Sequence, residues 1–155
     1  MTIKNISIFD LDGTIIDSSH RQCTLPDGTL DLDHWRENAT PEMISRDRVL
    51  PLADQVRKRV HAGDFVMVCT ARVLSDADRE FLFEHGICVD KIVSRKDGDN
   101  SPDGKLKARA LSSLFNLKQF RKASKVMFDD AASVRSALRP LGITVINPAK
   151  IAERV

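Results

Sequence analysis

Long apolar runs and a strong excess of either charge are both missing from this sequence. No stretch approaches the roughly 18 apolar residues that span a bilayer, and the N-terminus lacks the basic, apolar and small-residue segments of a signal peptide. The net charge of +2 is too small to indicate nucleic-acid binding by itself. We therefore expect a cytoplasmic protein with no membrane partner.

Cysteine is also scarce. Cys23, Cys69 and Cys88 form no CxxC pair and have no histidine at metal-ligand spacing, which favours free thiols. No internal repeat or low-complexity segment is present. A chain of 155 residues with 42% hydrophobic residues can bury one ordinary core, so we expect a single domain spanning residues 1–155.

Short runs of β-branched and apolar residues alternate with helical patterns along the chain. Strands are predicted at 3–9, 65–69, 89–93, 125–128 and 143–146. Helices are predicted between Pro51 and Gly63, between Ser75 and Gly86, along the stripe Leu106, Ala110 and Leu114, and at 134–141. This alternation predicts an α/β fold, a Rossmann-like three-layer sandwich around a mostly parallel five-stranded sheet.

Residues 18–50 interrupt this rhythm. The segment carries Pro26, an Asp27-Gly28 turn, Trp35 and a helix start at Thr40-Pro41. Ligands of parallel sheets bind beyond the carboxyl ends of the strands. We expect the segment to be a short insert over that face, too small to form a domain.

Acidic residues follow the first and fourth predicted strands. Asp10 and Asp12 stand where the first strand runs out into Gly13, and alternate residues of an extended chain point to the same side. Asp129 and Asp130 end the fourth strand. Four carboxylates in one crevice repel one another unless a cation neutralises them. Because oxygen-only ligands favour magnesium over zinc, the expected cofactor is Mg²⁺.

The second predicted strand ends in Thr70, Ala71 and Arg72. This tripeptide offers a hydroxyl, exposed backbone amides and a guanidinium, which are groups suited to phosphoryl oxygens. The site at this edge of the sheet is therefore expected to bind phosphate.

The sequence Asp-x-Asp-Gly-Thr at residues 10–14, with Thr70, a later lysine and Asp129-Asp130 in that order, resembles the haloacid dehalogenase (HAD) superfamily of phosphatases. The resemblance implies that Asp10 is the nucleophile and that Asp12 protonates the leaving oxygen and then activates water. Thr70, the lysine and neighbouring groups of Thr14 and Ala71 would hold the phosphate. Mg²⁺ would bind Asp10, the Asp12 carbonyl, and Asp129 or Asp130.

The catalytic lysine is either Lys105 or Lys107. Gly98-Asp99, Asp103, Lys107 and Asp129-Asp130 resemble the phosphatase domain of phage-type polynucleotide kinase-phosphatases, which favours Lys107. Arg72 matches the substrate-contacting arginine of that family, and the insert is short where other relatives carry a large cap. The sequence departs from the family at Ser101 and Ala131, where arginine is usual.

The resemblance implies a magnesium-dependent phosphomonoesterase for nucleotides or polynucleotide 3′-phosphate ends, so the expected partner is a phosphorylated small molecule or a nucleic-acid end. The location would be the host cytosol if the protein is phage-encoded. A second hypothesis is a phosphatase of sugar phosphates or other metabolites, which requires the insert at 18–50 or a partner subunit to close the pocket. The sequence leaves the oligomeric state open.

Two hypotheses without turnover stay open as well. A phospho-Asp signalling receiver also gathers acidic residues, a threonine and a lysine around Mg²⁺. In receivers the acidic pair lies on the first strand, whereas here the Asp-x-Asp-Gly-Thr motif comes first and the acidic pair late, which speaks against this reading. A catalytically inactive binding module is disfavoured because every acidic position that the mechanism needs is present.

Overall fold

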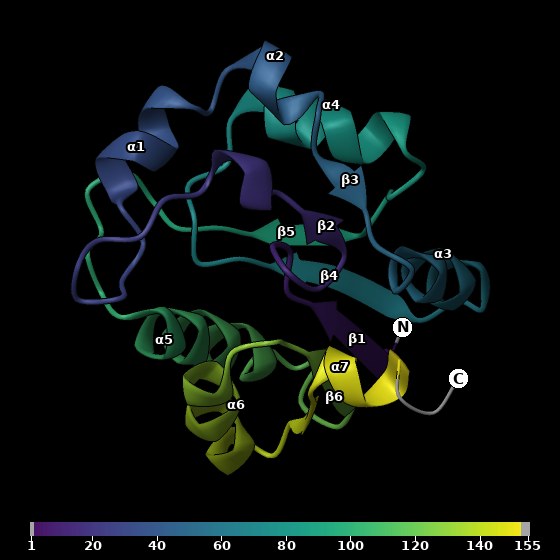
Figure 1. The fold of residues 1–155 in the computed structure, drawn as a ribbon. Coiled ribbons are helices and arrows are strands. Elements are labelled where there is room, and N and C mark those ends of the chain that lie inside the picture. Colours follow the sequence, from purple (N-terminus) through teal and green to yellow (C-terminus); the bar gives the residue numbers. More distant parts are fainter. Residues whose placement is uncertain (1, 153–155) are drawn as a thin grey trace.

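A parallel five-stranded sheet forms the centre of the computed structural model, which describes residues 2–152 (Figure 1). The strand order is β5-β4-β1-β6-β7, and every neighbouring pair is parallel. The strands are β1 (Asn5–Phe9), β4 (Phe65–Cys69), β5 (Lys91–Val93), β6 (Ser124–Phe128) and β7 (Thr144–Ile146). The predicted parallel sheet is confirmed, although β1 and β5 begin two residues later than expected.

Helices cover both faces of the sheet, which gives the predicted three layers. In Figure 1, α5 (Asp103–Phe115) and α6 (Ala132–Leu138) lie on one side, and α3 (Ala53–His61) and α4 (Asp76–Glu84) on the other. The alternation of side chains along β1 explains the two cores. Ile6 and Ile8 pack with the α5 and α6 side, while Phe9 packs with the α3 and α4 side.

Two short helical elements flank β7 near the end of the described residues, η2 (Arg139–Leu141) before it and α7 (Pro148–Ala152) after it. Gly142 follows η2, at the position where the sequence predicted the helix to end. Its φ of 79° lies in the left-handed region and turns the chain toward β7. None of the helices within residues 2–152 combines the length and apolar character that crossing a membrane requires.

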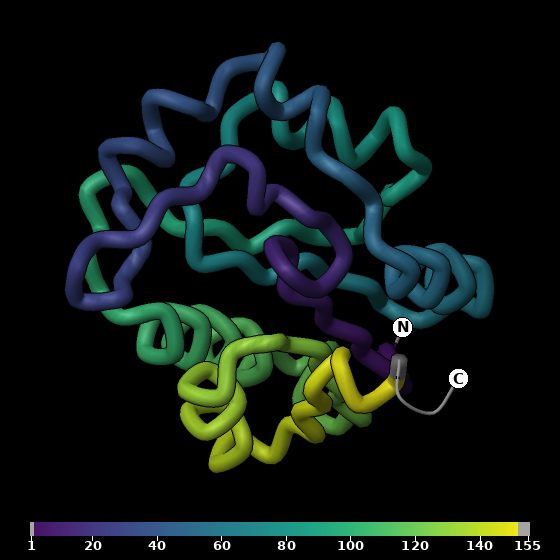
Figure 2. Tube along the Cα trace, viewed as in Figure 1, coloured from purple at the N-terminus to yellow at the C-terminus, as the bar shows by residue number. Residues whose placement is uncertain are grey.

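Residues 18–47 form the insert, which begins and ends at a small antiparallel ribbon of β2 (Ile16–Asp17) and β3 (Arg48–Val49). The insert carries η1 (Ser19–Arg21), α1 (Leu32–Glu37) and α2 (Pro41–Ile44). The helix start expected at Thr40 is confirmed, because its hydroxyl accepts a hydrogen bond from Met43 N. Figure 2 shows the insert arching between β2 and β3, and α2 packs against α4.

Helix α5 is rotated about its own axis relative to the orientation that its apolar stripe predicted. The predicted buried stripe was Leu106, Ala110 and Leu114, but Ala110 and Leu114 are only half-buried. The residues buried at four-residue steps are instead Lys107, Leu111 and Phe115. The reason is that α5 packs against α6, with Gly104 close to Val134 and Ala137, and this contact fixes the helix rotation so that Leu111 and Phe115 enter the core. Lys107 therefore points inward.

The cysteines give a simple test of this packing. All three are free thiols; Cys23 and Cys88 are exposed and Cys69 is buried. Burial raises the pKa of the Cys69 thiol to about 12, so the reactive thiolate does not form there at neutral pH. We expect an aromatic disulfide reagent at pH 8 to modify Cys23 and Cys88 rapidly and Cys69 only after denaturation. Rapid modification of Cys69 in the folded protein would contradict this packing.

Candidate active site

Three carboxylates converge beyond the carboxyl ends of β1 and β6. Asp10 follows β1, and Asp129 and Asp130 follow β6. One carboxylate oxygen of each lies within 4.8 Å of those of the other two. Asp10 and Asp129 are buried, whereas Asp130 is exposed. Parallel pairing of β1 with β6 explains the convergence, because Phe9 and Phe128 are register partners and the next residue of each strand is an aspartate.

Lys107 supplies the positive charge that faces this acidic cluster. Its ammonium nitrogen lies 2.9 Å from Asp10 Oδ1 and 2.7 Å from Asp129 Oδ2. Burial alone would lower the pKa of Lys107, but Asp10 and Asp129 outweigh burial and raise the pKa above its ordinary value. Lys105 is exposed two residues earlier and has no ion pair within the described residues. Of the two candidate lysines, the geometry brings Lys107 into the site.

A single ammonium does not fully compensate the buried carboxylates. Burial raises the pKa of Asp10 to about 7, with Lys107 opposing the rise and Asp130 adding to it. The pKa of Asp129 is raised as well, first by burial and then by the neighbouring Asp10. Both shifts mean that the cluster holds more negative charge than its protein surroundings stabilise.

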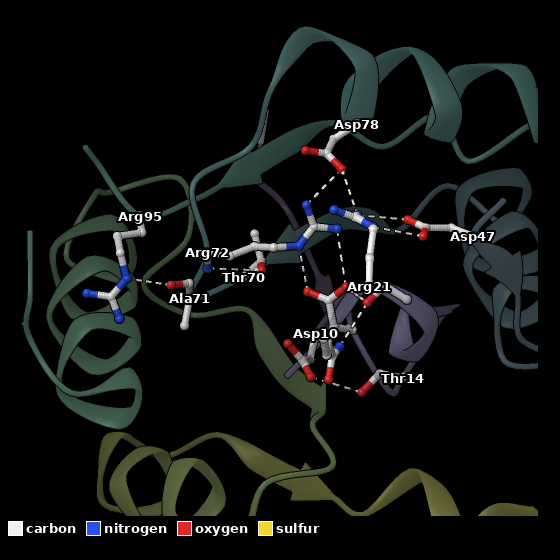
Figure 3. Close-up of polar contacts among 12 residues, drawn as sticks. Asp10, Thr14, Arg21, Asp47, Thr70, Ala71, Arg72, Asp78 and Arg95 are labelled. Carbon is white, nitrogen blue, oxygen red and sulfur yellow. Dashed lines mark hydrogen bonds and ion pairs between the residues drawn. The ribbon is translucent and has the colours of Figure 1, made fainter. Parts of the chain in front are cut away.

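Thr14 contacts the acidic cluster directly, and Thr70 stands on the neighbouring strand end. Thr14 Oγ1 donates a hydrogen bond to Asp10 Oδ2 over 3.1 Å, and both side chains are buried. Thr70 is buried at the end of β4, where its hydroxyl accepts a bond from Arg72 N. Figure 3 shows Thr14 directed at Asp10 and Thr70 on the adjacent strand end. The Ala71 carbonyl accepts a hydrogen bond from the side chain of Arg95.

Asp12 is held by two neighbours on the side facing the insert. Arg72 contacts both of its carboxylate oxygens, with Nε 2.6 Å from Oδ2 and Nη2 3.2 Å from Oδ1. Ser18 Oγ donates to Asp12 Oδ1 over 2.6 Å. Arg72 Nη1 lies 2.7 Å from Asp78 Oδ1. The guanidinium that sequence comparison assigned to substrate therefore faces protein carboxylates on both sides, through hydrogen bonds at Nε and Nη2 and through an ion pair without hydrogen-bond geometry at Nη1.

Sequence reasoning missed a buried charge network behind Arg72. Arg21 donates to both oxygens of Asp47 over 2.9 and 2.8 Å and lies 3.3 Å from Asp78 Oδ1. The Arg21 and Arg72 guanidiniums lie 4.4 and 5.0 Å from the centroid of the Trp35 ring. Burial opposes ionisation of Asp78, but Arg72 and the hydrogen bonds from Ser75 hold its pKa below the usual range. Figure 3 shows this network reaching from Asp47 to the strand ends.

The polar side chains of the loop between β5 and α5 form hydrogen bonds mainly within the loop and with the ends of the neighbouring elements. Arg95 donates to the carbonyls of Ala71 and Asp99 and to the carboxylate of Asp103. Asp99 accepts from Ser101, whose backbone and hydroxyl both donate to Oδ1. These contacts fix the loop against the end of β4.

The donor set fits a divalent cation. Asp10, Asp129 and Asp130, when ionised, carry three negative charges against one positive charge on Lys107, so two remain. The converging donor atoms are all carboxylate oxygens, which suit Mg²⁺ rather than zinc. The raised pKa of Asp10 is the expected sign of a site that lacks part of its counter-charge.

Similar folds occur among HAD hydrolases. A putative phosphatase from Clostridium difficile matches with a TM-score of 0.65 and 16% identity, over 95% of this chain and 86% of its own. A HAD-like hydrolase from Streptococcus pneumoniae matches with a TM-score of 0.67 and 14% identity, over 93% and 84%. A chain of the Pnkp1/Rnl/Hen1 RNA repair complex matches with a TM-score of 0.61 and 23% identity, over 94% and 42%. The chain therefore has the HAD-like fold, as predicted.

A family model described as bacteriophage T5 5′-deoxynucleotidase matches residues 1–155 of this chain. The chain belongs to this family. The 5′-deoxynucleotidase of Escherichia phage T5 is 37% identical over 89 residues, which cover 55% of this chain and 36% of the phage T5 protein. The alignment thus spans little more than a third of that relative.

Proposed function

We propose that this protein is a Mg²⁺-dependent phosphatase that removes the 5′-phosphate of deoxynucleoside monophosphates through a phosphorylated Asp10. The observation that carries the proposal is the buried Asp10 carboxylate between Lys107 and Thr14, beside Asp129 and Asp130. A carboxylate with fixed hydrogen-bond partners at the end of a central strand is a preorganised nucleophile.

The reaction has two displacements. In the first, a carboxylate oxygen of Asp10 attacks phosphorus, the bond from phosphorus to the nucleoside 5′ oxygen breaks, and Asp12 gives its proton to that oxygen. In the second, water attacks the aspartyl phosphate, Asp12 takes a proton from the water, and the bond from phosphorus to Asp10 breaks to free inorganic phosphate. Lys107 holds the attacking carboxylate in place and neutralises part of the charge on the transferred group.

Magnesium would be held by Asp10 and by one or both of Asp129 and Asp130, with the Asp12 carbonyl as a further oxygen ligand. When bound, it would offset the charge of the carboxylates and of the phosphate oxygens. Thr70 and the backbone around Ala71 lie on the adjacent strand end, where they would position the phosphate.

Two observations favour a 5′-deoxynucleotide over a polynucleotide 3′ end. The family model that covers the chain is a 5′-deoxynucleotidase model. The 3′-end hypothesis rested partly on Arg72 as a substrate contact, and Arg72 is instead engaged by Asp12 and Asp78.

The test measures phosphate release from the four 5′-deoxynucleoside monophosphates, their ribose counterparts, a 3′-phosphorylated oligonucleotide and a sugar phosphate. We expect the 5′-deoxynucleotides to give the highest kcat/KM, and a chelator or Asp10→Asn to abolish turnover. A higher kcat/KM for the 3′-phosphorylated oligonucleotide or for the sugar phosphate would overturn the assignment of 5′-deoxynucleotides as substrates. Full activity of Asp10→Asn would overturn the mechanism, and a long-lived phosphoprotein without turnover would support a receiver.

A further inference from the structure

We propose that Asp78 is a positioning residue that orients the acid-base residue Asp12 through Arg72. This inference rests on the proposed function, because it assumes that Asp12 transfers the proton to the leaving oxygen. Asp78 lies on α4, the helix that follows β4, and its side chain contacts Ser75, Arg21 and Arg72 rather than the acidic cluster. Its effect passes through a guanidinium that contacts both carboxylates.

Arg72 is a bridge with two occupied sides. One side, Nε and Nη2, pairs with the two oxygens of Asp12. The other side, Nη1, lies 2.7 Å from Asp78 Oδ1. This contact is an ion pair without hydrogen-bond geometry, so Asp78 holds the Nη1 side through charge. Because a guanidinium is planar, attraction at Nη1 biases the direction from which Nε and Nη2 reach Asp12. Arg72 is 8% exposed, which leaves little water to replace a lost partner.

The two carboxylate oxygens of Asp78 contact different groups. Oδ2 accepts hydrogen bonds from Ser75 N and Ser75 Oγ over 3.0 and 2.9 Å, which closes the capping box of α4. Oδ1 faces the guanidiniums of Arg72 and Arg21 at 2.7 and 3.3 Å. The helix cap requires only the first oxygen. The second oxygen is left to hold the arginines.

The insert fixes the far end of this chain of charges. Arg21 is fully buried and paired with both oxygens of Asp47, so it does not compete freely for Asp78. Trp35 lies against both guanidiniums and limits their movement. The sequence of contacts is Asp12, Arg72, Asp78, Arg21 and Asp47, and it alternates in sign throughout. Asp78 is the shared partner at its centre.

Asp78→Asn isolates this role. The amide oxygen can still accept from Ser75, which places the amide nitrogen, a donor, against two guanidiniums. Arg72 then loses its second anchor, and the geometry of Asp12 changes while Asp10 and Lys107 stay in place. Loss of proton donation matters for a poor leaving group such as a nucleoside hydroxyl, and much less for an aryl oxide that leaves without a proton.

The experiment compares kcat/KM for the preferred nucleotide with kcat/KM for p-nitrophenyl phosphate, each normalised to folded protein. For Asp78→Asn we expect a loss on the order of 10-fold with the nucleotide and less than about 3-fold with the aryl phosphate. Equal losses on both substrates, or no loss, would overturn the inference. A structural role alone lowers both values together, so the ratio separates the two explanations.

Two controls accompany this comparison. Ser75→Ala removes the helix cap without touching Oδ1; it is expected to lower Tm by about 2–4 °C and to leave the ratio of the two kcat/KM values unchanged.

If Asp78→Asn fails to fold, Asp78→Glu keeps the charge but displaces it by one methylene, and a skew of the ratio in the same direction is expected. A wild-type ratio in a folded Asp78→Glu would then count against the inference. Activity in Asp10→Asn contradicts the proposed function itself, whereas an inactive Asp10→Asn with an unskewed Asp78→Asn contradicts only the role of Asp78.

Discussion

Lys107→Met is expected to remove activity and to destabilise the protein strongly. The substitution keeps most of the side-chain volume but deletes the charge that pairs with Asp10 and Asp129. Removing one partner of a buried ion pair costs about 3–5 kcal/mol because the remaining charge is left without compensation. For a chain of this size the loss corresponds to a fall in Tm of roughly 10 °C. We expect kcat to fall by at least about 10²-fold, since a charged donor to the reacting groups is lost.

Lys105→Met is the matched control for this prediction. The side chain lies two residues earlier on α5, is exposed and makes no ion pair within the described residues. Surface substitutions of this kind stay within about 0.5 kcal/mol, so Tm and kcat should stay near the wild-type values. Thermal unfolding and steady-state kinetics of the two variants check the assignment. Comparable losses in both variants would mean that Lys107 has no special position.

The acidic part of the site was predictable because it depends on topology. Asp10 and Asp129 each follow an apolar strand, and parallel strands bring their carboxyl ends to one edge. The sequence separation of the two residues does not matter once the strands are paired. The fold followed from the same alternation of strands and helices, so the sheet and three of the four expected carboxylates were predicted together. The prediction was wrong for Asp12, because its carboxylate pairs with Arg72 and Ser18 instead of joining the cluster.

The rotation of α5 was harder to predict. Leu106, Ala110 and Leu114 form a plausible apolar stripe, and a stripe drawn one residue later through Leu111 and Phe115 is equally plausible. Contact with α6 decides between them, and this contact is tertiary information. The choice of Lys107 rested on family resemblance for this reason. Phe115, Leu111 and Lys107 are spaced by four residues, so they share one face of the helix. This spacing is the sequence signal that could have placed Lys107 on the buried face.

The network around Asp78 could not be predicted from local sequence. Asp78 stands three residues after Ser75, and the capping box accounts for an acidic residue at that position. Its second oxygen meets Arg21, which is 57 residues away in a segment without strong periodicity. Nothing in the sequence near Arg21 or Asp47 indicates that they pair. Contacts of this kind arise only when the insert packs against α4.

Gly13→Ala is expected to lower Mg²⁺-dependent activity strongly while leaving the fold intact. Gly13 has a φ of 78°, and a Cβ at this position would lie 2.3 Å from Asp130 Oδ2. The Asp130 side chain must move away, which removes an oxygen from the proposed metal site. A displacement of about 1 Å near reacting groups costs on the order of 10²-fold in rate. The measurement is kcat/KM together with the Mg²⁺ concentration that gives half-maximal activity.

Gly63→Ala separates this clash from the cost of backbone strain. Gly63 has a φ of 90°, but nothing lies within 4 Å of its added Cβ, and it follows α3 at the opposite end of β4 from Thr70. Both variants place a side chain in the left-handed region, at about 1–2 kcal/mol. We expect similar losses in Tm for the two proteins, with the loss of activity and the weaker Mg²⁺ response confined to Gly13→Ala. If Gly13→Ala instead keeps the wild-type Mg²⁺ response, Asp130 does not contribute to metal binding, and Asp10 and Asp129 remain as the proposed carboxylate ligands.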